Sequence, residues 1–499
     1  MFYLLNFAGQ YFYPLTVACC LVVIVWIYFY NNPLAHNQSF MMRRFVNWLP
    51  LGMTYAFLCM GRFNIIVSQS ALMTKEQFGI VFGVGNLVYA LSFLVNGPLI
   101  DKYLGGKKGM LIAAVGSALA NIALGVLTYY ILVKHIKVNL VLAFSVIYSI
   151  NMYFQSYGAV SIIKVKAYWF HVRERGVFGA IFGTLISFGI YFAFDWGGAI
   201  LKMTKAAAPD NWLKALFTPL NGLADATWAV FYIPAAALLF WMVIDMWLIK
   251  DTPEDAGFPH LDTCDASSGQ MHIEFSVMDL LKKIFSSRLM WMIAFVELAS
   301  GVFRQGMSQW YQTFVREQQP AVDFFSQHWG WLACIFGIIG GFAGGLISDK
   351  WFQSRRGPPA ALLCGFVVIV ACLMSFFLFS QPYIVGWSAV AISMASIGIT
   401  SLMSGTAATD FGGRKATATC AGIVDGFAYL GSALQSVCLG FIVTKWGWQW
   451  WPIFLIPFAI GGLWIAIKIW HELPAATRKY NDEADQKEVV EKAAAGIAT

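Results

Sequence analysis

The sequence predicts an all-α, polytopic membrane protein of two six-helix bundles and one extra N-terminal transmembrane helix. Three observations support this: 59% of the 499 residues are hydrophobic, only 12% are charged, and the apolar residues form long unbroken runs. A helix needs about 20 apolar residues to cross a hydrocarbon core of about 30 Å. The same composition excludes a soluble globular enzyme, a disordered chain and a nucleic-acid-binding module.

The apolar runs number thirteen, seven before a polar stretch at 250–286 and six after it. They lie at about 11–30, 45–68, 78–100, 109–133, 138–162, 177–200 and 227–249, and then at 289–314, 328–348, 359–380, 384–408, 418–443 and 449–470. We therefore divide the chain into an extra helix and linker (1–44), an N-terminal bundle (45–249), a central loop (250–286), a C-terminal bundle (287–471) and a charged tail (472–499).

The first run is the extra one. Residues 1–30 contain no Lys or Arg, and residues 31–37 offer no convincing small-residue cleavage site. A retained helix is therefore favoured over the alternative, a cleaved signal peptide.

The distribution of positive charge predicts the orientation. Of the 33 basic residues, 21 fall on the side that holds the central loop and the tail, and eight fall on the other side. Because cytoplasmic loops carry the excess of Lys and Arg, the C-terminus is expected inside and the N-terminus outside. We expect a multi-pass protein of a bacterial inner membrane, acting as a monomer.

The two groups of six runs share a motif. The segment from Gly97 to Gly109 matches the segment from Gly345 to Gly357 at a constant offset of 248 residues. Internal repeats of this kind are typical of secondary transporters, which bind their substrate between the two halves. The motif has the pattern G-x-x-x-D-[KR]-x-x-x-x-[KR]-[KR], and we expect its acidic and first basic residues to gate the transport path: Asp101, Lys102, Asp349 and Lys350.

Two arginines inside the apolar runs suggest the ligand. Arg62 and Arg304 are 242 residues apart, so they occupy nearly equivalent places in the two halves. Charges at the bilayer centre are costly and usually functional. Arginine matches phosphate with a planar fork of donors, and two arginines would neutralise a phosphate monoester of about −2 charge. Lys164 and Asp425 are further intramembrane candidates.

No cofactor or metal is expected. The chain has nine cysteines but no His, Cys and Asp cluster with metal-ligand spacing, and no nucleotide-binding motif. An enzyme is therefore not expected.

Residues 43–472 resemble the organophosphate:phosphate antiporters of the major facilitator superfamily. The resemblance rests on the stretch from Tyr55 to Asn64, on Arg304-Gln-Gly followed by Trp310, on the D-T-P-x-x-x-G run from Asp251, and on Ala421-Gly followed by Tyr429-Leu-Gly. It implies a fold of two six-helix bundles and exchange of a phosphorylated metabolite for inorganic phosphate by alternating access. By the same resemblance Arg62 and Arg304 bind the phosphate, and the further substrate-binding candidates are Tyr55, Tyr89, Lys164, Trp310 and Tyr429. Asp425 has no assigned family counterpart and is a substrate-binding candidate because it is an acidic residue inside an apolar run.

The chain departs from the family pattern in the second and fourth helices. Phe93 stands where glycerol-3-phosphate transporters carry a lysine, Tyr168 stands in place of a histidine, and residues 157–163 lack the family's prolines. These changes leave the organic group undetermined. Two alternatives therefore remain: a membrane receptor that senses a sugar phosphate, and a proton-coupled anion symporter with Glu297 or Asp425 as the proton site.

Overall fold

The structure is a computed structural model. It describes residues 2–30, 32, 34–171, 174–217, 225–261, 263, 277–319, 323–352 and 355–472. The side chains of some helical residues, Asp349 and Lys350 among them, lie outside the description, as does the tail from 473. Across the described ranges every regular element is a helix, which confirms the all-α prediction.

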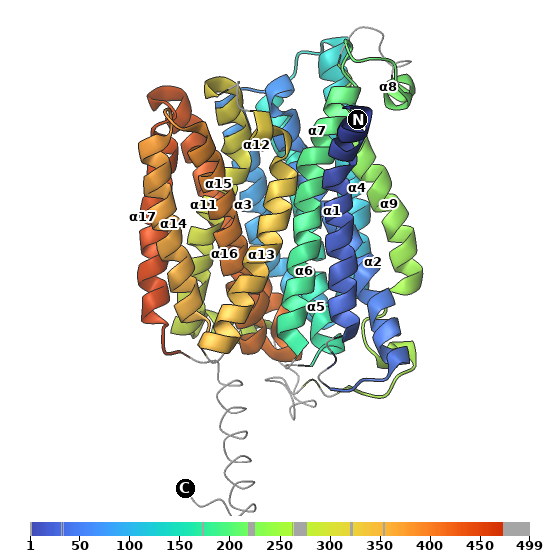
Figure 1. The fold of residues 1–499 in the computed structure, drawn as a ribbon. Helices are drawn as coiled ribbons and strands as arrows, with labels where there is room; N and C mark the ends of the chain where they lie inside the picture. The colour runs from blue at the N-terminus through green and yellow to red at the C-terminus, as the bar shows by residue number, and fades with distance from the viewer. Residues whose placement is uncertain are drawn as a thin grey trace, which may run out of the picture.

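The first half of the chain begins with a long helix that precedes the bundle (Figure 1). Its elements are α1 (Phe2–Tyr30), α2 (Gln38–Leu72), α3 (Lys75–Leu99), η1 (Ile100–Leu104), α4 (Gly105–Lys134), α5 (Leu140–Trp169), α6 (Arg175–Tyr191), η3 (Phe192–Trp196), α7 (Gly197–Met203), α8 (Trp212–Phe217) and α9 (Ala229–Leu248). The segments α6, η3 and α7 run on without a break, so they cross the bundle as one rod.

The second half follows the central loop. Its elements are α10 (Val277–Ser286), α11 (Arg288–Gln318), α12 (Asp323–Gln327), α13 (Trp329–Trp351), α14 (Gly357–Phe377), α15 (Pro382–Thr400), η6 (Ser401–Ala407), α16 (Ala408–Trp446) and α17 (Trp450–Lys468). Six of these helices are long, as the sequence predicts for this half. Helix α1 starts at the end of the bundle opposite to the end where α17 stops (Figure 1).

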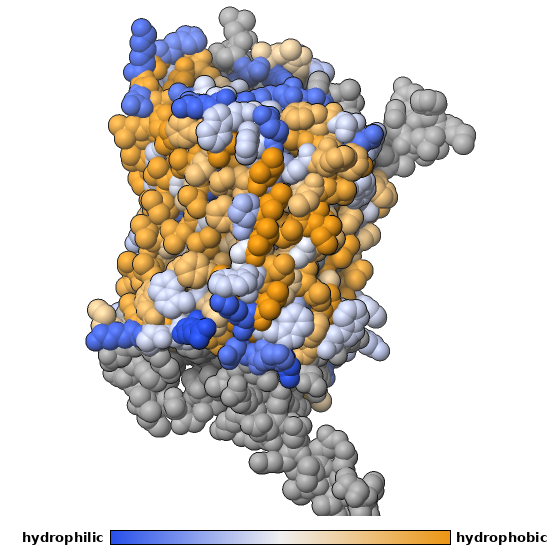
Figure 2. All heavy atoms as spheres, turned by 90° about the vertical axis from the view of Figure 1, so that its left-hand side faces the viewer, coloured by the Kyte–Doolittle hydropathy of each residue, from blue (hydrophilic) through white to orange (hydrophobic). Residues whose placement is uncertain are grey.

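The outer surface suits a bilayer. In the described ranges, nine helical segments are long and apolar enough to cross a membrane, and one of them, 75–134, contains both α3 and α4. Figure 2 shows a broad hydrophobic band between two hydrophilic rims. Helices α5 and α11 are not among the nine segments, because they bury polar side chains on their inward faces.

The two halves meet along α3 and α16, and along α6 and α13. Glycines permit the first contact: a Cβ on Gly79 would lie 2.6 Å from the Ser436 carbonyl oxygen, and one on Gly97 would lie 2.9 Å from Cα of Thr419. Gly97, the first residue of the repeated motif, thus permits close approach of α3 and α16. Gly345, its repeat counterpart, has no atom within 4 Å of such a Cβ.

Helix α1 packs on the outside of the seam between the halves, where it contacts both α6 and α13. Its Thr16 hydroxyl accepts a 2.8 Å hydrogen bond from the Trp331 indole, and the Tyr13 ring stacks on His328 with centroids 3.8 Å apart. At its other end, the Tyr28 hydroxyl accepts from Arg44 Nε at 2.9 Å. The extra helix is therefore attached to both halves.

The D-T-P run that starts at Asp251 follows α9, the last helix of the first half. The Asp251 carboxylate accepts a 2.7 Å hydrogen bond from the Lys107 backbone amide at the start of α4, and burial raises its pKa. Gly257 ends the following 3-10 turn with φ of 84°, a conformation that favours glycine. The motif thus fixes the point where the central loop leaves the bundle.

Candidate functional site

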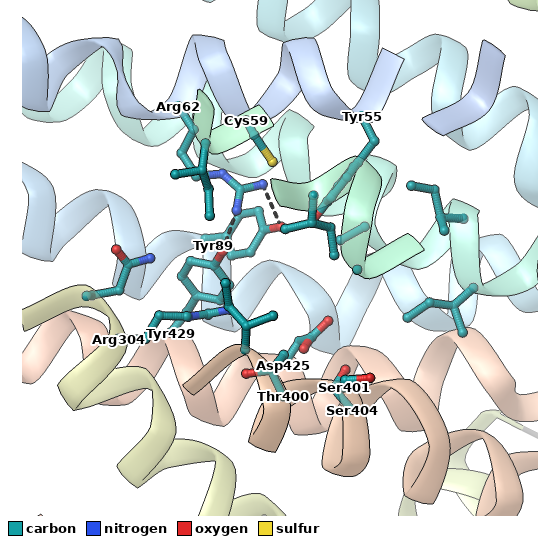
Figure 3. A pocket seen from close by; sticks show the side chains of 18 of the residues that line it. Tyr55, Cys59, Arg62, Tyr89, Arg304, Thr400, Ser401, Ser404, Asp425 and Tyr429 are labelled. Atoms are coloured by element: carbon teal, nitrogen blue, oxygen red, sulfur yellow. Dashed lines mark hydrogen bonds between the residues drawn. The ribbon is translucent and has the colours of Figure 1, made fainter. Parts of the chain in front are cut away.

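A central cavity lies between the halves. Helices α2, α3, α5 and α6 form one wall, and α11, α15, η6 and α16 form the other. Its polar lining residues are Tyr55, Arg62, Tyr89, Lys166, Arg304, Gln305, Ser308, Thr400, Ser401, Ser404, Asp425 and Tyr429. Figure 3 shows the labelled members of this set converging from both halves.

Arg62 is held in one orientation by three partners. Its Nε donates to Gln155 at 2.7 Å, one terminal nitrogen donates to the Tyr89 hydroxyl at 3.0 Å, and the other donates to the Tyr429 hydroxyl. A guanidinium has five N–H donors, so two remain for a ligand, one on each terminal nitrogen. Those two donors are available to phosphate or carboxylate oxygens.

Arg304 reaches the same cavity from the other half. Its guanidinium carbon lies 5.7 Å from the centre of the Tyr429 ring, and that of Arg62 lies 5.4 Å from the same ring. In the part of the chain that the structure describes, no ion pair within 4.0 Å is formed by Arg304. The two arginines, one from each half, therefore flank one tyrosine.

Carboxyl and hydroxyl groups of the second half lie beside the arginines. Asp425 of α16 lines the cavity near Thr400 and Ser404 (Figure 3). Glu297 lies behind this wall, fully buried, and accepts a 2.7 Å hydrogen bond from the Thr400 hydroxyl. The site thus contains both signs of charge.

Most of the residues that the sequence singled out for the substrate lie on this cavity. Arg62, Arg304, Tyr55, Tyr89, Asp425 and Tyr429 line it. Trp310 does not: it is fully buried, in edge contact with Phe78. Lys164 does not line it either, because its ammonium pairs with Asp101 at 2.7 Å.

Asp101 joins the halves at one end of the bundle, called here the Asp101 end. Besides the ion pair with Lys164, its carboxylate accepts from the Thr419 backbone amide at 2.8 Å and from the Thr419 hydroxyl at 2.7 Å. Lys102 is exposed, with its ammonium 5.5 Å from the Tyr103 ring centre. The other expected gating side chains, Asp349 and Lys350, lie outside the description.

The opposite end, called here the Asp195 end, is also closed. Asp195 of η3 accepts from the backbone amides of Gly330 and Trp331, at 2.8 and 3.0 Å, where α13 begins. Lys75 and Glu317 form a 2.8 Å ion pair across the halves. Polar contacts thus join the two halves at both ends of the bundle.

The sequence predicted no substrate-binding or gating role for several residues that the structure places at these contacts. They are Gln155, Lys166, Ser404 and Asp195. Asp101, Asp195 and Ser404 each lie in a π-helical segment, a geometry that is frequent at functional sites. A π-turn shifts the helical phase, so sequence spacing alone does not predict which face such a residue takes. No cluster of three or more metal-ligating side chains occurs within the described ranges.

Comparison with known proteins decides the family. A model described as "Major Facilitator Superfamily" matches residues 51–436. The chain belongs to the major facilitator superfamily. Solved structures of this superfamily share the fold: the fucose transporter FucP in the outward conformation (16% identity, TM-score 0.57, 85% of this chain and 98% of that one), and a bacterial homologue of the human lysosomal transporter Spinster (16%, TM-score 0.59, 90% and 99%).

Curated relatives confirm the resemblance to the organophosphate:phosphate antiporters within this superfamily. The glycerol-3-phosphate transporter of Bacillus subtilis is 25% identical, over 80% of this chain and 85% of its own length. A probable hexose phosphate transport protein of Chlamydia trachomatis is 23% identical, over 82% and 85%. The membrane sensor protein UhpC of Escherichia coli is 21% identical, over 80% and 85%.

Proposed function

We propose that this protein exchanges a phosphorylated metabolite, of the glycerol phosphate or sugar phosphate class, for inorganic phosphate by alternating access. The observation that carries this proposal is the pair Arg62 and Arg304, which reach one cavity from the two halves and flank Tyr429. A phosphate of about −2 charge neutralises both guanidinium groups and bridges the halves. The relatives' printed substrates, glycerol-3-phosphate and hexose phosphate, support it.

Coupling follows from the same two charges. In an empty site the arginines repel each other, by roughly 2–4 kcal/mol at 4–10 Å and an effective dielectric of about 20. The occluded state is therefore disfavoured when the carrier is empty. A bound phosphate attracts both arginines and so favours the occluded state. It can do so only because it binds the occluded state more tightly than the open states. Either phosphate substrate thus permits the return step.

The gates complete the proposed cycle. In the structure, hydrogen bonds cross the halves at both the Asp101 end and the Asp195 end. Opening one side requires breaking one set while the other persists. The basic residues lie mainly at the Asp101 end, so we assign that end to the cytoplasm of a bacterial inner membrane, with the C-terminus inside. A protease-accessible N-terminal tag on the cytoplasmic face would contradict this orientation.

Conservative substitution tests the phosphate site. We expect Arg62→Lys and Arg304→Lys each to weaken inorganic phosphate binding at least tenfold, because lysine keeps the charge but lacks the planar fork. Arg316→Lys is the matched control: it lies on α11 and donates to the Ser70 hydroxyl, away from the cavity. Titration calorimetry on purified protein measures the affinities. Parent-like binding by either cavity variant would refute the assignment.

One relative favours a second candidate, a sensor of sugar phosphates, since UhpC is named a membrane sensor protein. Reconstituted vesicles separate the two functions. A transporter moves labelled phosphate, whereas a sensor binds it without flux.

The place of Asp425 in the cavity leaves the proton-coupled symporter as a third candidate. Uptake that collapses with the proton gradient, but not with removal of internal phosphate, would identify it.

A further inference from the structure

The cavity contains an acidic side chain that a phosphate site does not require. Asp425 lines the cavity on α16 and is partly exposed to it. Within the described ranges, no Lys, Arg or His nitrogen lies within 4.0 Å of its carboxylate. Ser404 is placed to donate a hydrogen bond to it. The carboxylate therefore faces the space where a ligand would lie.

Phosphate binding makes this carboxylate harder to accommodate. The two arginines supply +2 and a phosphate monoester supplies about −2, so a bound phosphate leaves the charge of Asp425 uncompensated. A buried charge without a partner is strongly unfavourable. A cationic group of the protein, a cationic group of the ligand or a bound proton can compensate this charge.

Besides the two arginines, Lys166 is the third cationic residue on the lining. It lies at a different depth along the bundle from the arginines. It is 11 residues beyond Gln155, the partner of Arg62 on α5, which is about 16 Å along a helix. It also borders a second pocket next to Trp169 and Phe170. Lys166 is therefore positioned away from the arginine level.

We propose that the ligand carries the missing charge: the organic phosphate bears a cationic amino group, which Asp425 binds. This inference rests on the proposed function. Asp425 is four residues from Tyr429 on α16, which is about 6 Å along the helix. Asp425 therefore lies one helical turn from the tyrosine that both arginines contact, within reach of a small ligand whose phosphate the arginines hold.

The surrounding groups suit an ammonium. An ammonium has three donors and no acceptor, and here one carboxylate and the hydroxyl oxygens of Thr400 and Ser404 lie together (Figure 3). A ligand hydroxyl in place of the ammonium would make hydrogen bonds but would leave the negative charge of Asp425 unbalanced. A carboxylated phosphate would add a like charge. The expected order of affinity is amino phosphate, then polyol phosphate, then carboxylated phosphate.

Ligand pairs that differ only in the amino group test this. Purified full-length protein is titrated at pH 7 with glucosamine 6-phosphate against glucose 6-phosphate, and with inorganic phosphate as reference. We expect the amino member to bind at least tenfold more tightly. Asp425→Asn should abolish this preference and should tighten, not weaken, inorganic phosphate binding, because it removes the carboxylate charge that a bound phosphate leaves uncompensated. Asp245→Asn is the matched control, since Asp245 is buried against Thr54 and does not line the cavity; the preference should persist.

The outcomes separate this inference from the proposed function. Equal affinity for the two sugar phosphates in the parent protein, or a preference that survives Asp425→Asn, overturns the amino-group proposal. The parent ratio decides the matter even if the variant does not fold. Failure of inorganic phosphate to bind at all would instead overturn the proposed phosphate site.

Discussion

Asp101 and Asp195 each accept hydrogen bonds from backbone amides of the opposite half, at opposite ends of the bundle. Asp101 contacts Thr419 of α16, and Asp195 contacts Gly330 and Trp331 of α13. Each carboxylate lies in a π-helical segment. At the two ends of the bundle the halves are thus joined by the same chemistry on different helices.

This arrangement predicts opposite effects of two substitutions. Asp101→Ala should open the Asp101 end and raise backbone hydrogen exchange at residues 418–419, whereas Asp195→Ala should raise it at residues 330–331. Each variant removes charge-assisted bonds worth about 1.5–3 kcal/mol apiece. Hydrogen–deuterium exchange with mass spectrometry measures both ends in one experiment.

Lys102→Ala provides the control, because Lys102 is exposed next to Asp101. It should leave both amide pairs protected as in the parent. Equal loosening of both ends by either aspartate variant would argue against independent gates.

A pH dependence of stability is predicted for the junction of α1, α2 and α6. Glu174 is buried; burial favours its neutral form, but hydrogen bonds from His36 and Arg44 outweigh this and lower its pKa to about 2. Because the folded pKa lies below the unfolded value of 4.5, the stabilisation is fully present above pH 4.5. It is lost as the pH falls towards 2, by up to about 3 kcal/mol. Thermal unfolding in detergent between pH 6 and 3 measures it.

Glu174→Gln isolates this contribution. The variant should melt at a lower temperature than the parent at pH 6, and the difference should shrink as the pH falls. A difference independent of pH would show that the carboxylate charge of Glu174 does not stabilise the fold.

A positioning role is predicted for Gln155, which binds Arg62 Nε but does not line the cavity. Gln155→Leu should weaken inorganic phosphate binding about 3–10-fold, the size of one lost hydrogen bond. In an Arg62→Lys background the same change should have little further effect, because the group it orients is gone. Ser156→Ala is the control, since Ser156 binds Asn96 instead. Full additivity of the two changes would contradict the positioning role.

The arginine pair could be predicted because the sequence contains an internal repeat, and Arg62 and Arg304 occupy similar places in its two halves.

The direction in which Lys164 points could not be predicted from the sequence. Lys164 is two residues from Lys166, about 200° around a helix, and only the distant Asp101 decides that Lys164 faces the gate while Lys166 reaches the cavity.

The position of α1 could not be predicted for a related reason. An apolar run indicates that a helix crosses the membrane, but not which helices it contacts. The Thr16 and Trp331 hydrogen bond joins residues 315 positions apart, and no local pattern encodes it. Trp310 was misplaced similarly, since its edge contact with Phe78 follows from tertiary packing.

Exchange of labelled phosphate from reconstituted vesicles tests the central claim most directly. Vesicles are loaded with labelled inorganic phosphate, and release is followed with and without phosphate or an organic phosphate outside. Because Arg62 and Arg304 repel each other in an empty occluded site, we predict slow release alone and much faster release when either substrate is outside. Equal release rates with and without an external substrate would contradict the account.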